Sequence, residues 1–148
     1  MHKYMPGSRI TAIEYYLPKN KENNKTLKKN NPKLNIDRIK EKTGINNRYI
    51  SSENESVIDI SIKCSNKIFK KFPKQKIDLI LLVTQTSPYR IPTTACILQN
   101  KLGLRKDIIA FDINLGCSGF LYALRMTTSL IESKQIKNGL IICADTYT

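Results

Sequence analysis

The sequence IIAFDINLGCSGFLYALRMTTSLIE, residues 108–132, decides the fold because it changes from strand to helix within a few residues. Residues 108–113 form a short apolar run, which is typical of a parallel strand buried on both faces. Gly116 permits a tight turn, and residues 117–132 then carry apolar side chains along one side of a predicted helix. A buried strand, a glycine turn and an apolar helix together indicate an α/β unit.

The same alternation continues on both sides of this stretch. Residues 77–84 (IDLILLVT) and 139–144 (GLIICA) are apolar runs that we expect to be buried strands. Residues 57–72 alternate like a strand in part, but their length favours a helix, and a further helix is predicted over 93–102. We therefore predict an α/β fold with a mostly parallel sheet flanked by helices.

The first third of the chain gives weaker signals. Residues 8–17 are rich in Ile, Thr and Tyr and predict a first strand. Residues 19–33 are rich in Lys and Asn and indicate a short helix or a loop. A short helix is predicted over 34–43, and residues 51–55 offer capping residues for the start of the next helix.

The composition indicates a globular protein with a basic surface. The chain has 148 residues, of which 41% are apolar, and a net charge of +13. Residues 18–50 hold ten Lys or Arg and three acids, a net charge of +7. Such a charge favours an anionic partner, although the general abundance of Lys and Asn also fits a merely solvated surface. Without a recognised motif or interleaved aromatic residues, no nucleic-acid partner is predicted.

Targeting and metal-binding signals are not found. The sequence has no run of the roughly 18 to 20 apolar residues that a membrane helix needs, and residues 1–7 lack a signal-peptide core, so we predict a cytoplasmic protein without a membrane partner. The four cysteines, at positions 64, 96, 117 and 143, form no Cys-x-x-Cys pair, and His2 is the sole histidine. These spacings predict no zinc or other metal site.

Cys117 is the candidate for chemistry. A helix N-terminus offers unpaired N–H groups and partial positive charge, which stabilise a thiolate. Gly116 and Gly119 leave room for an extended substrate beside the sulfur, and the N–H of Cys117 can help to hold an oxyanion. The alternative is an inert buried cysteine, which is what we expect of the other three.

Three segments, in this order, resemble the type III β-ketoacyl-acyl carrier protein synthases, a family related to thiolases. They are TGI at 43–45 followed by RYI at 48–50, IPTTACILQ at 91–99, and FDINLGCSGFLYAL at 111–124. The order and spacing of the three segments carry the resemblance, which extends from Ser8 to the end of the chain. The chain thus resembles the N-terminal half of such an enzyme.

The resemblance implies a fold and a reaction. Members adopt the thiolase fold, in which two similar α/β halves form one molecule that pairs as a homodimer. They move an acyl group from acyl-coenzyme A to a cysteine and condense it with malonyl-acyl carrier protein, releasing carbon dioxide, in fatty acid or related biosynthesis. No cofactor or metal is implied. A thioester on the cysteine divides acyl transfer into two easier steps.

The resemblance also assigns roles to four residues. Cys117 is the nucleophile. Lys42 matches a basic position that contacts coenzyme A phosphates, and Arg38 stands where other members have a tryptophan that stacks on adenine. Arginine can stack on a flat ring and pair with phosphate. Ile91 matches a loop position that reaches the acyl pocket of the partner subunit.

The family's catalytic histidine and asparagine lie in a C-terminal half, and residues 1–148 are therefore expected to be an N-terminal half-domain that is truncated and inactive by itself. His2, near the N-terminus, is not a substitute. One alternative is a non-catalytic fragment, or a half-subunit that needs a C-terminal partner. Another, within the family, is condensation in secondary metabolism or acylation of a sugar.

Overall fold

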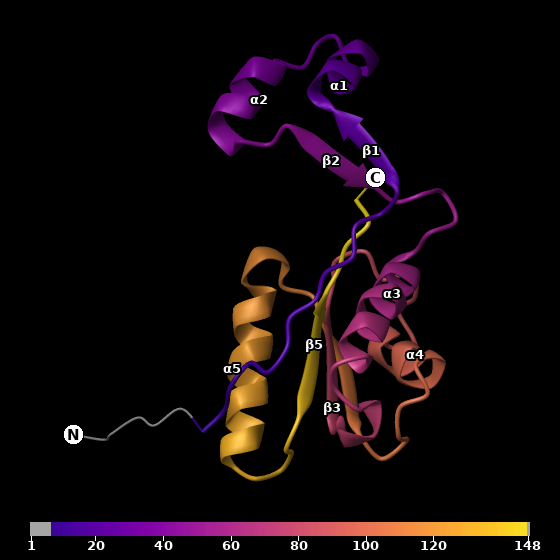
Figure 1. Ribbon diagram of the computed structural model, residues 1–148, viewed down its shortest axis with the longest axis vertical. Helices are drawn as coiled ribbons and strands as arrows, with labels where there is room; N and C mark the ends of the chain where they lie inside the picture. The colour runs from indigo at the N-terminus through magenta and orange to yellow at the C-terminus, as the bar shows by residue number, and fades with distance from the viewer. Residues whose placement is uncertain (1–6, 148) are drawn as a thin grey trace, which may run out of the picture. The chain divides into compact units, whose positions relative to one another are not determined.

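The computed structural model describes residues 7–147 (Figure 1). They form two compact units, one made of residues 7–16 and 56–147 and the other of residues 17–55. His2 lies outside the described residues.

The larger unit is built on a parallel sheet with the strand order β4-β3-β5. Its strands are β3 (Leu79–Val83), β4 (Ile109–Ile113) and β5 (Gly139–Cys143). Val83, the last residue of β3, lies opposite Ile113 on one side and Cys143 on the other. All three strands therefore end at one edge of the sheet. Every residue of the central strand is buried, as the apolar run 77–84 predicts.

Helices cover both faces of this sheet, with α5 on one face and α3 and α4 on the other (Figure 1). They are α3 (Val57–Phe69), α4 (Thr94–Lys101) and α5 (Gly119–Glu132), with short 3-10 turns at η1 (Lys74–Lys76) and η2 (Gly116–Ser118). Ile80 and Leu82 pack into the α3 and α4 core, whereas Leu79, Leu81 and Val83 pack into the α5 core. Successive side chains of a strand point to opposite faces. The predicted α/β fold is confirmed.

Helix α3 begins with a capping box. The Ser56 hydroxyl accepts from the N–H of Asp59 at 3.4 Å, and the Asp59 carboxylate accepts from the N–H of Ser56 at 2.9 Å. Each side chain thereby satisfies a backbone donor of the other residue. The hydrogen bonds from the side chain and then the backbone of Ser56 lower the pKa of Asp59. The cap predicted within residues 51–55 is therefore misplaced, because Ser56 is the capping residue and Asp59 is the acid of the capping box.

The smaller unit contains two strands and two helices: β1 (Asn20–Asn23), α1 (Asn24–Asn30), α2 (Ile36–Thr43) and β2 (Asn47–Ile50). The strands pair antiparallel, with Asn20 opposite Ile50. Gly44, at a φ of 70°, ends α2 and donates its N–H to Lys40 O at 2.8 Å, as its position in the sequence predicts. The strands were not predicted, because they are short and mostly polar.

The strand predicted over residues 8–17 is wrong, because none of these residues belongs to a strand of the described chain. Part of this segment instead bonds to α3 and to the turn that follows it. Lys71 forms an ion pair of 2.5 Å with Glu14, and Lys67 Nζ donates to Tyr15 O at 2.7 Å. β-propensity shows that a segment suits a sheet, but a strand also needs a partner edge.

Replacing Asp59 with Asn is expected to destabilise the protein at neutral pH and to have a diminishing effect in acid. The folded state lowers the pKa of Asp59, so its stabilising contribution is present above the unfolded value of 3.8 and is lost as the pH falls through the lower, folded value. Urea unfolding of the wild type and of Asp59→Asn, from pH 7 to pH 2.5, measures whether their free energies of unfolding converge in acid. The matched control is Glu53→Gln, at an exposed acid. The proposed role of Asp59 would be contradicted if Asp59→Asn lowered the free energy of unfolding by the same amount at every pH, or by no more than Glu53→Gln does.

Candidate active site

The loops that follow β3, β4 and β5 leave the sheet at one edge. Backbone pairing extends one residue past the strands, since Thr84 N donates to Ile113 O at 3.1 Å and Ala144 N donates to Val83 O at 3.1 Å. In open α/β sheets, ligands bind outside the carboxyl ends of the strands. This edge is therefore the candidate active site, and the Cys117 turn lies on it.

Cys117 lies in the turn between β4 and α5. It is exposed, and it belongs to η2, which Gly116 opens with a φ of 53°. Helix α5 thus begins at Gly119, two residues after the predicted start, because the chain first makes a tighter 3-10 turn. The prediction of a cysteine at a strand-to-helix junction is confirmed in this adjusted form.

A close contact fixes where α5 begins. A Cβ added to Gly119 would overlap Cγ1 of Val83, the last residue of β3. The backbone of the first turn of α5 therefore lies directly against β3, an approach that glycine alone allows. This contact holds the turn that carries Cys117 against the edge of the sheet.

The remaining cysteines differ in burial. Cys64 and Cys96 are half-buried, and their thiols donate weakly to Glu14 O at 3.5 Å and Ala110 O at 3.7 Å. Burial raises the pKa of Cys64. Cys143 is exposed, so its expected burial is wrong, because it lies at the very end of β5. Desolvation and then the charge of Asp145 raise its pKa, which favours the protonated thiol at neutral pH.

Asp145 joins the ends of β5 and β3, a role that the sequence reading missed. Its Oδ1 accepts from Gln85 N at 2.7 Å and from Thr84 Oγ1 at 3.0 Å. It also accepts from the N–H and the hydroxyl of Thr86, at 3.2 and 3.1 Å. Hydrogen bonds to an ionised carboxylate are stronger than neutral ones. The available signal was an acid placed directly after a buried strand.

Asp112 organises the neighbouring loop and was also missed. Its two carboxylate oxygens accept from the N–H groups of Thr94 and Ala95, both at 2.7 Å, at the start of α4. A carboxylate there suits the positive end of the helix. The loop that leads into α4 contains Ile91, whose side chain is 89% exposed.

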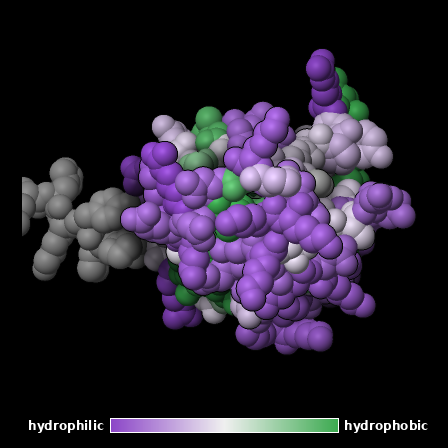
Figure 2. All heavy atoms as spheres, turned by 90° about the horizontal axis from the view of Figure 1, so that it is seen from above, coloured by the Kyte–Doolittle hydropathy of each residue, from purple (hydrophilic) through white to green (hydrophobic). Residues whose placement is uncertain are grey.

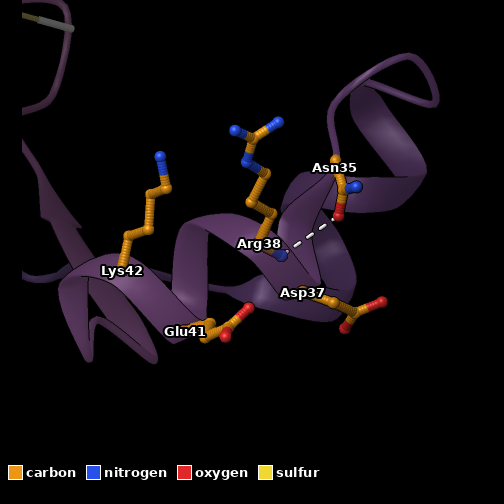
Figure 3. Close-up of a pocket in the computed structure, with 5 residues that line it drawn as sticks. All are labelled: Asn35, Asp37, Arg38, Glu41 and Lys42. Atoms are coloured by element: carbon orange, nitrogen blue, oxygen red, sulfur yellow. Dashed lines mark hydrogen bonds between the residues drawn. The ribbon is translucent and has the colours of Figure 1, made fainter.

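Arg38 and Lys42 lie together on α2 in the smaller unit. They are four residues apart, and their side chains point to the same side of the helix, whereas Asp37 and Glu41 point away from them (Figure 3). Together with Asn35 these residues line an open hollow of about 590 Å³. Asn35 caps α2, and its Oδ1 accepts from Arg38 N at 3.0 Å.

The four predicted site residues thus fall into two pairs. Cys117 and Ile91 lie in loops of the larger unit, and Arg38 and Lys42 lie on one helix of the smaller unit.

Within residues 7–147, no three His, Cys, Asp or Glu side chains gather in a way that could hold a metal ion. Over the same residues, no helix combines the length and apolar character needed to cross a bilayer.

The sequence around the Cys117 turn is similar to that of known proteins. The family described as 3-oxoacyl-[acyl-carrier-protein] synthase III matches residues 111–148, which include the Cys117 turn. A β-ketoacyl-[acyl-carrier-protein] synthase III of Clostridium perfringens is 40% identical over 146 residues, 97% of this chain and 44% of the relative. The corresponding protein of Acholeplasma laidlawii is 44% identical over 107 residues, 70% of this chain and 34% of the relative.

Solved structures agree with the sequence comparison. The 3-oxoacyl-[acyl-carrier-protein] synthase III of Aquifex aeolicus has a TM-score of 0.80 at 37% identity, covering 88% of this chain and 42% of that one. The β-ketoacyl-[acyl carrier protein] synthase III of Thermus thermophilus has a TM-score of 0.84 at 26% identity, covering 94% of this chain and 43% of that one. The chain spans less than half the length of each of these proteins.

The parallel sheet, its helical layers and the strand-to-helix cysteine define a thiolase-like α/β protein. The chain is similar, over nearly its whole length, to the N-terminal half of 3-oxoacyl-acyl carrier protein synthase III proteins, and residues 111–148 match the model of that family.

Replacing Gly119 with Ala is expected to lower the free energy of unfolding by about 1–3 kcal/mol, because the new methyl group overlaps Val83 and forces α5 away from β3. Denaturant unfolding measures the loss. Ser129→Ala, at an exposed position of the same helix, is the matched control and is expected to change little. Equal effects of the two substitutions would contradict the close contact.

Proposed function

We propose that this chain supplies the acyl-accepting part of a 3-oxoacyl-acyl carrier protein synthase III, with Cys117 as the nucleophile. The observation that carries the proposal is an exposed thiol at the carboxyl edge of a buried parallel sheet, in a turn that belongs to the family match. The thiol is reachable from solvent. The expected space beside Gly116 and Gly119 is instead filled by the side chains of Gln85 and Val83, so a thioester would approach Cys117 from the solvent side.

The proposed step is a transfer between sulfur atoms. The Cys117 thiolate attacks the carbonyl carbon of an acyl-coenzyme A, the new C–S bond forms, and the bond to the coenzyme A sulfur breaks. The departing thiolate takes up the proton that Cys117 released. Backbone N–H groups of the turn are suited to hold the oxyanion of the tetrahedral intermediate that forms during this transfer. Condensation with malonyl-acyl carrier protein and loss of carbon dioxide follow, without a cofactor.

Arg38 and Lys42 are proposed to bind coenzyme A, and Ile91 is proposed to contact the acyl chain. The paired cations on α2 suit the phosphates of coenzyme A, and the guanidinium of Arg38 can also stack on adenine. Ile91 projects from its loop almost fully exposed, as a residue would that fills the acyl pocket of a partner subunit. Its branched side chain would then influence which acyl chain fits.

Further protein is needed to complete the enzyme. Large apolar side chains are exposed on and beside α5, namely Leu115, Phe120, Leu121, Tyr122 and Met126. An apolar patch of this kind marks a surface that another part of the protein covers. We assign that role to a C-terminal half carrying the acid–base residues. The outer strand β4 pairs only with β3 within the described residues and exposes Ile109, which suits pairing in a homodimer.

Acyl carrier protein is the proposed protein partner. The face seen in Figure 2 is covered mostly by hydrophilic side chains, and residues 18–50 carry a net charge of +7. Such a surface would steer an acidic carrier toward the enzyme, with an on-rate that falls as salt rises. A cytoplasmic location stays a prediction. The exposed α5 patch equally favours the alternative, a half-subunit that has no activity until a C-terminal partner covers it.

Incubation of the chain with an acyl-coenzyme A is expected to add one acyl group to the peptide that contains Cys117. Peptide mass spectrometry locates the addition. Cys117→Ser is expected to abolish it, and Cys143→Ser, at the other exposed cysteine, to retain it. An unmodified Cys117 peptide would count against the proposed nucleophile, and ketoacyl product from the chain alone would overturn the need for a C-terminal half.

Replacing both Arg38 and Lys42 with Ala is expected to weaken coenzyme A binding about tenfold, because two exposed cations contribute a little over 1 kcal/mol in all. Isothermal titration calorimetry measures the affinity. Lys25→Ala combined with Lys29→Ala, which removes two exposed cations from α1, is the matched control. Equal loss in the control would assign the effect to net charge and contradict a specific site on α2.

A further inference from the structure

The side chain of Gln85 lies directly on the turn that precedes Cys117. A Cβ built on Gly116 would lie 3.0 Å from Oε1 of Gln85 and 3.4 Å from its Nε2. Gln85 follows β3, whereas Gly116 follows β4, so the contact joins two loops at the same edge of the sheet. The Gln85 amide thus fills the space that a side chain at position 116, next to Cys117, would need.

The loop after β5 holds Gln85 at two points. Asp145 accepts the backbone N–H of Gln85 at 2.7 Å, and the Tyr147 hydroxyl donates to the Gln85 side-chain Oε1 at 2.5 Å. Partial desolvation, and then the charges of Asp145 and Cys117, raise the pKa of Tyr147. The phenol therefore stays protonated, and able to donate, well above neutral pH.

One part of the Gln85 amide has no partner within residues 7–147. Its Oε1 is engaged by Tyr147, but no hydrogen bond uses the two donors on Nε2. A side-chain amide has two N–H donors that suit negative charge. We propose that Gln85 is a positioning residue for Cys117, which fixes the Gly116 turn and supplies an N–H donor beside it.

The inference deepens the proposed function, because it assumes that Cys117 ionises. Its test uses a reaction that needs no acyl donor. The rate of alkylation by iodoacetamide is followed at Cys117 by peptide mass spectrometry between pH 6 and pH 10. Acyl transfer in the wild-type chain tests the proposed function separately, so either idea can fail alone.

Gln85→Glu is expected to raise the pH midpoint of Cys117 alkylation by roughly half a unit to one unit, because it replaces an N–H donor with a nearby anion. Gln85→Leu is expected to raise it by a few tenths of a unit, because it removes the donor without adding charge. Gln75→Glu is the matched control. It makes the same change of charge at an exposed glutamine in η1, before β3, at the opposite edge of the sheet.

A Gln85→Glu midpoint equal to that of Gln75→Glu would overturn the proposal. So would midpoints that remain at the wild-type value in both Gln85 variants while the alkylation rate changes, since that pattern describes a structural role alone. Thermal unfolding shows whether each variant is folded. If Gln85→Glu does not fold, Gln85→Leu decides the outcome by itself.

Discussion

The close approach of Gly119 to Val83 is the constraint on which the candidate site depends. It lets α5 begin directly against the last residue of β3. The chain from β4 must then reach the helix through a tight turn, and that turn exposes Cys117 at the carboxyl edge of the sheet. A larger side chain at position 119 would move the helix and the turn together.

Two carboxylates fasten the loops around this turn. Asp112 binds the start of α4, and Asp145 ties the end of β5 to the end of β3. In both cases a carboxylate accepts from backbone N–H groups that secondary structure leaves unpaired. Because several donors share each carboxylate, the loops at this edge are held in fixed positions relative to the sheet. Such support suits a nucleophile, because catalysis requires that the reacting atoms be held in a defined geometry.

Much of the larger unit could be predicted from sequence, for a physical reason. The strands read as continuous apolar runs, although only β3 is buried along its whole length. Helix α5 has a clear apolar side, and Pro92 and Gly103 mark the bounds of α4. The contacts of Asp112, Gln85 and Asp145 could not be predicted, because they join residues from different loops that meet only in the folded chain. The polar strands β1 and β2 gave no periodic signal, and the first segment lacked the partner edge that a strand requires. The sequence predicted that Cys117 lies where a strand leads into a helix. The reactivity of its thiol remains a prediction.

A crystal structure of the chain after exposure to an acyl-coenzyme A would show which cysteine accepts the acyl group. We expect an acyl carbonyl carbon bonded to Sγ of Cys117, with the Gly116 turn and the Gln85 amide unmoved beside it. A free thiol at position 117 together with an acyl group on Cys143, or on no cysteine, would contradict it.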